Sequence, residues 1–449
     1  MIRTNSKEVK QGDIFIALKG AKYDGHNYVD DAIKRGAIKV IVEHGTYDVE
    51  TLRVEDTKKY LVDFVKEFYL PRIKNIKLIG ITGTNGKTTS CFLIYQMLNK
   101  LNIPCAYIGT IGFYMKDTIK VLENTTPDIL SIYQMLNECK ENGIKYVAME
   151  VSSHALALNR IEGLTFDYTV YTNLTQDHLD FHKDMNEYAL IKQKLFKLIK
   201  DDGKAVINND DEYSDVMKIK NYITYGFSKA DYQLLNYSIE NNNTIFTFRH
   251  EDIEYIVKSP LLGKYNIYNL LTMIIVLHEE GLTLPDIINK IPILKAPAGR
   301  MDTVYYNDNK IIIDYAHTPD AVFNILNAIK EFSNGRIYSI IGCGGNRDKT
   351  KRPKMTFYAV AMCDKVIITN DNPRFENPSD IIDDMLHNSV KDNYEVIPNR
   401  EEAIKRGVEL LTKDDILVIL GKGHEDYQII NDEKIHHNDK EYVLKICRG

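Results

Sequence analysis

The chain contains 449 residues, of which 44% are hydrophobic and 27% are charged, and its formal net charge is -6. A chain of this length is expected to form about three domains at roughly 150 residues each. Its mildly acidic balance lacks the basic block of a nucleic-acid-binding protein, so we expect no nucleic acid as a partner.

The cysteines and the apolar segments indicate the compartment. The six cysteines include no CxxC pair, which favours reduced thiols in a cytoplasm. The first residues, "MIRTNSKEVKQGD", lack the apolar core of a signal peptide. No apolar run approaches the ~20 residues that a membrane-spanning helix needs. We therefore expect a cytoplasmic protein with no membrane partner.

Three α/β patterns follow one another along the chain. In residues 1–73, a strand in "GDIFIALKG" precedes a helix and a strand in "DDAIKRGAIKVIVE". In residues 74–298, apolar strands alternate with helical stretches, which is typical of a mostly parallel sheet with helices on both faces. The alternation restarts in residues 299–449. We predict an α/β fold of three domains: a small N-terminal α/β domain (1–73), a central P-loop domain with a doubly wound, mostly parallel sheet (74–298), and a C-terminal Rossmann-like domain (299–449).

Three segments of the central pattern predict particular elements. "NNNTIFTFRHEDIEYIV" predicts a hairpin, and "KYNIYNLLTMIIVLHEEG" predicts a helix. "YALIKQKLFKLIK" predicts an amphipathic helix with Tyr188, Ile191, Leu195 and Ile199 on one face and Lys192 beside that face.

The segment "KLIGITGTNGKTTS", from Lys77 to Ser90, predicts a phosphate-binding loop between a strand and a helix. Such a loop turns backbone N–H groups and the positive end of the helix toward phosphate oxygens. Lys87 is expected to reach the β and γ phosphates, and the Thr88 hydroxyl to bind Mg²⁺. The strict pattern G-x-x-x-x-G-K-[ST] requires glycine at position 81, where this chain has Ile81. Its glycines instead recur every third residue.

Two polar groups follow neighbouring strands of the central pattern. Glu150 ends the strand of "VAMEVSS", where α/β sheets place ligands, and is a candidate Mg²⁺ ligand. The segment "NLTQDHLDFH" places a cluster of Asp and His residues after the next strand along the chain. Taken alone, this cluster is also compatible with a transition-metal site. The cluster consists of Asp177, His178, Asp180 and His182. Taken alone, Lys192 predicts only a solvated lysine on a helix.

An ordered set of motifs resembles the Mur ligases, most closely those of the MurE type. In chain order the set is "GITGTNGKTTS", "NTTPD", "MEVSSHALALNR", "NLTQDHLDFH", "YALIKQKLF", "GKYNIYN", "APAGRMD", "IDYAHTPDA", "GCGGNRDKTKRP", "NDNPRFENP" and "LGKGHEDYQ". The resemblance covers nearly the whole chain. It accounts for the relaxed loop, because Mur ligases use the form G-x-x-G-x-x-G-K-T.

The resemblance implies an ATP site, two Mg²⁺ ions and a modified lysine. The implied ATP contacts are Gly83, Thr84, Asn85, Gly86, Lys87, Thr88, Thr89, Asn266, Asn269, Arg300 and Asp314. The implied catalytic residues are Lys87, Glu150, His178 and Lys192, and the implied Mg²⁺ ligands are Thr88, Glu150, His178 and Lys192. In this family the matching lysine is carbamylated by CO₂. A carbamate gives the anionic oxygen that Mg²⁺ prefers.

The resemblance also implies the reaction and its acceptor. The γ-phosphate of ATP passes to the D-Glu carboxylate of UDP-N-acetylmuramoyl-L-Ala-D-Glu, and the amine of an amino acid then displaces phosphate from the acyl phosphate. This is a step in peptidoglycan precursor synthesis. The implied contacts to the nucleotide-sugar substrate are Ser6, His26, Thr125, Thr126, Ser152 and Arg160.

The segment "NDNPR" indicates which amino acid is added. In the MurE type, this signature marks enzymes that take meso-diaminopimelate, and lysine-adding relatives lack the arginine. The arginine fork of Arg374 suits the second carboxylate of diaminopimelate, which lysine lacks. The implied diaminopimelate contacts are Arg347, Asp371, Asn372, Pro373, Arg374, Gly421 and Glu425, with Glu425 facing the distal ammonium.

The N-terminus departs from the family pattern. Family members carry a further leading segment and Asp-Ser-Arg where this chain has Asn5, Ser6 and Lys7. This departure keeps an alternative open: a paralogous ligase with another acyl acceptor, or with L-lysine as the amine. A nucleotide-dependent binding protein without turnover predicts the loss of Lys87, Glu150, His178 or Lys192, and all four are present. No exposed apolar stripe argues for an obligate oligomer, so we expect a monomer.

Overall fold

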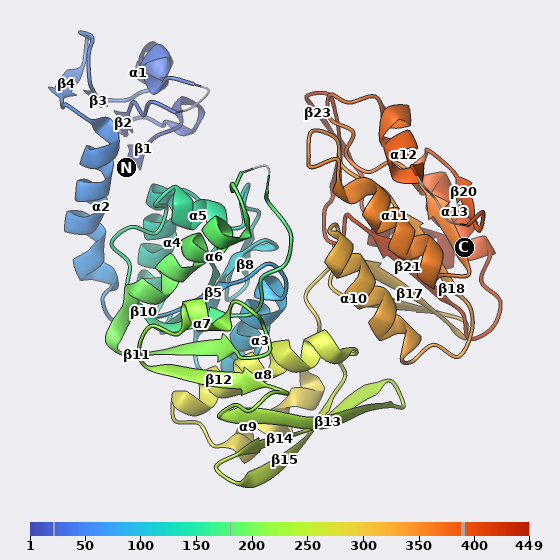
Figure 1. Ribbon diagram of the computed structural model, residues 1–449. Coiled ribbons are helices and arrows are strands. Elements are labelled where there is room, and N and C mark those ends of the chain that lie inside the picture. The colour runs from blue at the N-terminus through green and yellow to red at the C-terminus, as the bar shows by residue number, and fades with distance from the viewer. Residues whose placement is uncertain (21–22, 180, 388–390, 449) are drawn as a thin grey trace. The chain divides into compact units, whose positions relative to one another are not determined.

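The computed structural model describes residues 1–20, 23–179, 181–387 and 391–448 (Figure 1). Its contacts divide the chain into two compact units, and each is described by itself. The first unit comprises Met1–Ile76, Pro127–Ile144 and Asn159–Leu164, and the second comprises the remaining described residues.

The first unit is built on a small parallel sheet with the strand order β1-β2-β3-β4. Asp56 starts the long helix α2 because its side chain accepts hydrogen bonds from the N–H groups of Lys58 and Lys59. Helix α4 comes from much later in the chain and packs on α2, with Tyr133 beside Tyr69. The elements are β1 (Ile2–Arg3), η1 (Ser6–Glu8), β2 (Ile14–Ile16), η2 (Gly25–Tyr28), α1 (Val29–Lys34), β3 (Lys39–Val42), β4 (Glu50–Arg53), α2 (Thr57–Ile73) and α4 (Ile129–Glu141).

The first part of the second unit is a large sheet with the order β15-β14-β13-β12-β11-β10-β5-β9-β6-β7-β8. Neighbouring strands from β13 to β6 run parallel, and the pairs at both ends run antiparallel, which confirms the mostly parallel sheet and the predicted hairpin. The strands are β5 (Lys77–Thr82), β6 (Cys105–Gly109), β7 (Gly112–Met115), β8 (Thr118–Lys120), β9 (Tyr146–Glu150), β10 (Phe166–Tyr171), β11 (Ile199–Asn208), β12 (Tyr222–Gly226), β13 (Tyr232–Glu240), β14 (Asn243–His250) and β15 (Ile253–Ser259).

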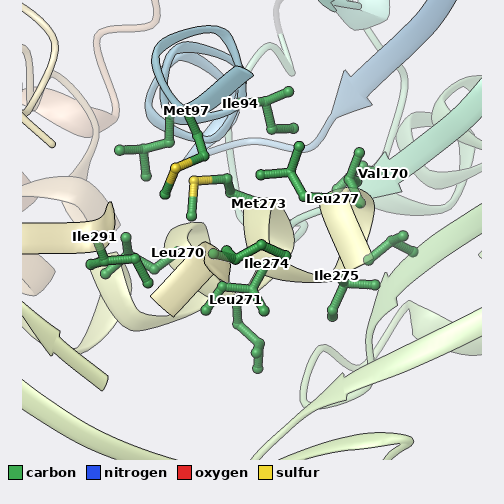
Figure 2. Packing of buried hydrophobic residues seen from close by; sticks show 14 of the residues in the cluster. Ile94, Met97, Val170, Leu270, Leu271, Met273, Ile274, Ile275, Leu277 and Ile291 are labelled. Carbon is green, nitrogen blue, oxygen red and sulfur yellow. The ribbon is translucent and has the colours of Figure 1, made fainter. Parts of the chain in front are cut away.

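Helix α8 confirms the helix predicted for "KYNIYNLLTMIIVLHEEG", and its side chains pack in the core of this part. Figure 2 shows Leu270, Met273 and Ile274 of α8 in one cluster with Ile94 and Met97 of α3. Burying each such side chain stabilises the fold by about 1.5–3 kcal/mol. The helices of this part are α3 (Lys87–Lys100), α5 (Ser153–Ala157), α6 (Met185–Gln193), η3 (Lys194–Leu198), α7 (Ser214–Met217), α8 (Lys264–Glu279), α9 (Leu284–Lys290) and η4 (Ile291–Ile293).

The predicted amphipathic helix over residues 188–199 is wrong in its second half. Helix α6 ends at Gln193, a 3₁₀ turn follows, and Ile199 begins β11, where it pairs with Phe166 of β10. Leu195 and Ile199 are buried as the spacing predicts. The apolar spacing therefore identified the buried side chains, but pairing with β10 decided the backbone.

The C-terminal part of the second unit has its own sheet, with the order β16-β17-β21-β18-β19-β20, in which only β16 is antiparallel among the described strands. Alternate residues of β21 face opposite cores, so helices cover both faces (Figure 1). The elements are β16 (Asp302–Tyr306), β17 (Asn309–Asp314), α10 (Pro319–Lys330), β18 (Ile337–Ile341), α11 (Lys351–Met362), β19 (Lys365–Ile368), α12 (Pro378–Leu386), β20 (Tyr394–Val396), α13 (Arg400–Glu409), β21 (Ile416–Leu420), β22 (Tyr427–Ile430), β23 (Glu433–His436) and α14 (Asp439–Cys447).

The carboxyl ends of β17, β18, β19 and β21 lie at one edge of this sheet, and each leads into a segment that the sequence analysis singled out. Ligands of open α/β sheets bind at this edge. Among the described helices, none combines the length and the apolar character that crossing a bilayer requires.

Candidate active site

The phosphate-binding loop connects β5 to α3, and its glycines are required by its geometry. Gly86, with φ of 84°, precedes the first residue of α3 in the left-handed region. At Gly83 a Cβ atom would lie 1.8 Å from Oγ1 of Thr172, so no larger residue fits. Gly83 therefore allows the loop to lie close to Thr172, the residue after β10, while a Cβ atom at Gly86 would meet Asn269 of α8.

Lys87 lies over the loop that precedes it. Its Nζ donates hydrogen bonds to the carbonyls of Gly83 and Thr84, both at 2.8 Å. Burial lowers the pKa of the Lys87 ammonium; the carboxylate of Glu150 opposes this shift and Arg300 adds to it. Lys87 therefore supplies a cation in a largely desolvated place, where an anionic phosphate group would be attracted strongly.

Glu150 and Thr88, two of the predicted Mg²⁺ ligands, are in direct contact. The Thr88 hydroxyl donates to Oε2 of the fully buried Glu150 at 3.0 Å. Glu150 also accepts hydrogen bonds from Tyr107 and from the backbone and hydroxyl of Thr110. The sequence analysis did not identify Tyr107 or Thr110, because nothing in their own segments indicates a contact with β9.

Lys192 is buried rather than solvated. Its Nζ donates to the Gly83 carbonyl at 2.8 Å, the same carbonyl that Lys87 contacts, and lies 4.5 Å from the centre of the Tyr188 ring. Burial lowers the pKa of the Lys192 amine well below its usual value, the charge of Lys87 lowers it further, and Asp177 opposes the shift. Burial therefore makes the neutral amine easier to reach here than at an exposed lysine.

His178 has a left-handed backbone, with φ of 55°, and its Nε2 lies 3.3 Å from Oδ2 of Asp177. Desolvation lowers the pKa of the His178 imidazole to about 4, while Asp177 opposes the shift. His182 is directed elsewhere, because its Nε2 lies 2.9 Å from the Ser153 hydroxyl and its ring stacks on Tyr188. Asp180 lies outside the described residues.

Among the described residues, one group of His, Cys, Asp or Glu side chains has the spacing of a metal site, and it lies in the first unit: Asp24, His26 and His44. Nε2 of His26 accepts a hydrogen bond from the N–H of Glu43 at 2.9 Å, so the ring proton sits on Nδ1 and is donated to Asp24. A metal on Nδ1 would displace that proton to a nitrogen that already faces a donor. The ring is therefore set as a hydrogen-bonding group and not as a ligand.

A cavity of about 820 Å³ opens beside the phosphate-binding loop and brings together many of the predicted ATP contacts. Its volume falls in the usual range for small-molecule sites. The Arg300 guanidinium donates to the Thr88 hydroxyl at 3.3 Å, and the Asn85 side chain donates to Asp320 at 2.8 Å. Asp320 was not among the predicted site residues. The predicted residues that line it are Asn85, Gly86, Thr89, Asn266, Asn269, Arg300 and Asp314.

A second cavity of about 280 Å³ contains most of the predicted diaminopimelate contacts together with Asp177 and His178. The predicted residues in its lining are Arg347, Asp371, Asn372, Arg374, Gly421 and Glu425; Pro373 is not in the lining. The sequence analysis missed His154, His317 and Lys351, which also face this cavity. The available signal was that each of the three lies in a quoted motif: His154 in "MEVSSHALALNR", His317 in "IDYAHTPDA" and Lys351 in "GCGGNRDKTKRP".

Arg374 lines this second cavity together with Glu425, and its own hydrogen bond is to a backbone carbonyl. Arg374 donates to the Gly345 carbonyl at 2.9 Å and forms no ion pair with any residue that the structure describes. Burial lowers the pKa of the Arg374 guanidinium, and the nearby charge of Arg347 lowers it further. Two neighbouring guanidinium groups of this kind suit an anionic ligand such as a carboxylate.

The six residues predicted to contact the nucleotide sugar are divided between the two units. Ser6, His26 and Arg160 belong to the first unit. In the second unit, the Thr126 hydroxyl donates to the Glu150 carbonyl at 2.8 Å and accepts from the Ser152 N–H at 3.0 Å, while the hydroxyls of Thr125 and Thr110 lie 3.0 Å apart. Thr125, Thr126 and Ser152 therefore lie around the carboxyl end of β9.

Comparison with known proteins identifies the family. Three family models match the chain: the Mur ligase catalytic domain over residues 1–69, the Mur ligase middle domain over residues 81–277, and the Mur ligase glutamate ligase domain over residues 299–423. A UDP-N-acetylmuramoyl-L-alanyl-D-glutamate--2,6-diaminopimelate ligase of Fusobacterium nucleatum is 40% identical over 99% of this chain and 93% of its own length. The chain belongs to the Mur ligase family. A relative of the same name from Aquifex aeolicus is also 40% identical, over 100% of this chain and 93% of its own length.

Solved structures agree with this membership. The structure of a UDP-N-acetylmuramoyl-L-alanyl-D-glutamate--2,6-diaminopimelate ligase matches with a TM-score of 0.68 and 32% identity, over 100% of this chain and 94% of the other. The MurF ligase of Thermotoga maritima, solved with ADP, matches with a TM-score of 0.72 and 20% identity over 99% of this chain and 96% of the other, which shows the shared fold alone. The three-domain α/β architecture of the Mur ligases is thereby confirmed.

Proposed function

We propose that this chain is an ATP-dependent ligase that joins meso-diaminopimelate to the D-Glu carboxylate of UDP-N-acetylmuramoyl-L-Ala-D-Glu. The observation that carries the proposal is the second cavity, where Arg374 and Arg347 lie beside Glu425 and next to Asp177 and His178. The names of the full-length relatives support the same substrate pair. The reaction belongs to peptidoglycan precursor synthesis, and we infer that it takes place in the cytoplasm.

The reaction proceeds in two displacement steps, and the two cavities supply the groups for them. An oxygen of the D-Glu carboxylate attacks the γ-phosphorus of ATP, and ADP leaves. The free amine of diaminopimelate then attacks the acyl carbon, phosphate leaves with the electron pair of the C–O bond, and the amine loses a proton as the amide forms. Lys87 stabilises the charge that develops on the transferred phosphoryl group, because it is a desolvated cation at the loop.

Divalent-metal and CO₂ chemistry fit the residues around the loop. The Thr88 hydroxyl and the Glu150 carboxylate are adjacent oxygen donors of the kind that Mg²⁺ prefers, and we assign them with His178 and Lys192 to two Mg²⁺ ions. When bound, Mg²⁺ neutralises phosphate charge. The depressed pKa of Lys192 supports carbamylation, because only the neutral amine adds CO₂.

Several finer assignments belong to the same proposal. The ATP contacts are those named for the first cavity together with Gly83, Thr84, Lys87 and Thr88. The nucleotide-sugar contacts are Ser6, His26, Thr125, Thr126, Ser152 and Arg160, and Pro373 shapes the turn that carries Arg374. We place the domain boundaries at residues 73/74 and 298/299, and we propose that the enzyme is a monomer.

A different acyl acceptor is the second candidate, favoured by one observation. Asn5 and Lys7 stand where the family pattern has Asp and Arg, and the Asn5 side chain accepts a hydrogen bond from the Lys7 N–H, which starts η1. This local role accounts for Asn5 without any acceptor contact. A paralogue with the same ATP and diaminopimelate machinery would then use another carboxylate.

The test is phosphate release from purified protein with ATP and Mg²⁺, omitting each substrate in turn, followed by mass spectrometry of the product. With an ¹⁸O-labelled D-Glu carboxylate, the proposal expects one ¹⁸O atom in each released phosphate. Phosphate release that requires diaminopimelate but not UDP-N-acetylmuramoyl-L-Ala-D-Glu would contradict the proposed acceptor. Unlabelled phosphate would contradict the acyl phosphate.

A further inference from the structure

The second cavity contains opposite charges that do not neutralise each other. Arg374 and Glu425 both line this cavity of about 280 Å³. A guanidinium and a carboxylate in so small a space attract each other strongly. Nevertheless, no ion pair joins these two described residues. Something must hold Glu425 away from Arg374.

Lys422 is the residue that holds Glu425. It follows Gly421 at the end of β21, and its side chain is 0% exposed, which is rare for lysine unless its charge is paired. Its Nζ donates to Oε2 of Glu425 at 3.0 Å and to Oδ1 of Asn372 at 3.1 Å. The lysine is therefore bonded to two of the segments that line the cavity, those of Asn372 and Glu425.

Asn372 completes the arrangement. Its Nδ2 donates to the same Oε2 of Glu425 at 2.9 Å, and its Oδ1 accepts from the N–H of Ile429 at 2.9 Å. Oε2 thus receives two hydrogen bonds, and Oε1 receives none from the described residues. Since Glu425 lines the cavity, Oε1 is the oxygen left for a ligand.

We propose that Lys422 is a positioning residue for selection of the amino acid: it holds Glu425 apart from Arg374, so that the cavity keeps one carboxylate oxygen without a hydrogen bond and one guanidinium without an ion pair. This inference rests on the proposed function. The far end of diaminopimelate carries one ammonium and one carboxylate, and each finds an unpaired partner. Without the Lys422 ammonium, Glu425 turns toward Arg374, and the two groups neutralise each other.

The chain offers a matched control for the loss of this charge. Lys422 and Lys434 approach the same Tyr427 ring, at 5.6 and 4.6 Å from its centre. Lys434 lies on β23 with an exposed side chain, and it contacts neither Glu425 nor Asn372. Lys434→Met therefore removes one positive charge near the cavity without removing the positioning contact.

The experiment compares Lys422→Met and Lys434→Met in steady-state kinetics. We expect Lys422→Met to raise the KM for diaminopimelate at least about tenfold, with kcat and the KM for ATP changed less than about twofold. We expect Lys434→Met to match the unaltered protein. Equal KM values for diaminopimelate in Lys422→Met and the unaltered protein would overturn the inference, as would a parallel loss in the KM for ATP.

A double-mutant cycle with Glu425→Gln separates positioning from general destabilisation. If Lys422 acts through Glu425, Lys422→Met/Glu425→Gln is no worse than Glu425→Gln alone. Multiplying effects would overturn the inference. Lys422→Gln, which keeps a donor but loses the charge, takes the place of Lys422→Met if the latter does not fold.

A structural measurement tests the inference without any turnover. In a crystal structure of Lys422→Met, we expect a carboxylate oxygen of Glu425 within about 4 Å of the Arg374 guanidinium. An unmoved Glu425 would overturn the inference even in an active enzyme. If the unaltered protein shows no diaminopimelate-dependent turnover, the proposed function fails, while this structural result still decides the role of Lys422.

Discussion

At position 192, the ammonium that a lysine normally carries is poorly solvated. Its described contacts are a carbonyl and an aromatic ring, and Lys87 points at the same carbonyl. The sequence alone predicted a solvated helix lysine, because burial depends on β5 and the phosphate-binding loop, which are about a hundred residues earlier in the chain. Only the family resemblance indicated a special role.

We expect Lys192→Met to lower kcat more than about a hundredfold. Mutating a residue that merely hydrogen-bonds to a metal ligand already lowers metal affinity or activity about 10- to 100-fold, and Lys192 is assigned as a ligand itself. Phosphate release measures the loss. After equilibration with ¹³C-bicarbonate, a carbamate carbon signal should appear in the unaltered protein and be missing in Lys192→Met. The same signal in both proteins, or full activity of the variant, would contradict the assignment.

We propose that selection of the amino acid depends on Arg374. Removing one partner of a buried, hydrogen-bonded charge pair costs about 2–5 kcal/mol, so Arg374→Ala should lower kcat/KM for diaminopimelate at least about thirtyfold. Arg374→Lys, which keeps the charge but not the fork, should recover only part of the loss. An unchanged kcat/KM for diaminopimelate in Arg374→Ala would contradict a contact between Arg374 and the second carboxylate of diaminopimelate.

The supporting roles of Tyr107 and Asp320 could not be found from the sequence. Each of these two residues makes its contact with a distant segment that no local pattern reveals: Tyr107 with Glu150, and Asp320 with Asn85. The glycines of the loop, in contrast, were found because their spacing is local. Sequence patterns therefore identified the loop and the strand ends, and missed the residues that support them.

At the scale of elements, one buried ion pair connects the starts of α13 and α14 to the end of β21. Arg400 begins α13, Asp439 begins α14, and their side chains are 1% and 0% exposed. The guanidinium contacts both carboxylate oxygens at 2.8 Å and donates to the carbonyl of Leu420, just before Gly421. This pair thus fixes the end of β21 beneath the second cavity.

Breaking this pair on one side should destabilise the fold more than replacing both partners. Asp439→Leu leaves a buried guanidinium unpaired, for an expected cost of about 3–5 kcal/mol in the free energy of unfolding. Arg400→Met/Asp439→Leu should cost less. Urea denaturation measures both variants, and a double variant that is weaker than Asp439→Leu would contradict this reading of the pair.

The same pair predicts a dependence of stability on pH. Burial alone would raise the pKa of the Asp439 carboxyl, but the charge and hydrogen bonds of Arg400 outweigh burial and hold that pKa well below its usual value. A carboxylate of this kind stabilises the fold above its unfolded pKa of about 3.9, and the stabilisation is lost as the pH falls further. The free energy of unfolding should therefore fall below pH ~4, and less steeply in Arg400→Met/Asp439→Leu.

Element boundaries show what sequence periodicity can and cannot decide. The strands of both large sheets and helix α8 were predicted from apolar runs, which reflect burial on both faces. The helix predicted over residues 188–199 ended early because β10 offered backbone partners to Ile199. Helix α4, predicted with the central pattern, packs instead on α2 of the first unit, a long-range choice that no local signal encodes.

At the scale of the whole molecule, the two compact units predict different responses to nucleotide. All predicted ATP contacts belong to the second unit. A ligand at 100 times its Kd stabilises the state that binds it by about 2.7 kcal/mol. Hydrogen exchange with ADP and Mg²⁺ should slow in peptides covering residues 83–90 and 264–270, with little change in residues 1–60. Slowing confined to residues 1–60 would contradict the assigned site.

The central claim is that this ligase selects diaminopimelate through the charges of its second cavity. The most direct measurement is a competition: one reaction containing ATP, Mg²⁺, UDP-N-acetylmuramoyl-L-Ala-D-Glu, and equal concentrations of meso-diaminopimelate and L-lysine, with the two products counted by mass spectrometry. Their ratio equals the ratio of the two kcat/KM values. We predict at least a hundredfold excess of the diaminopimelate product. Lysine has no second carboxylate, so binding it leaves the Arg374 guanidinium without a partner. Equal amounts, or an excess of the lysine product, would contradict the account.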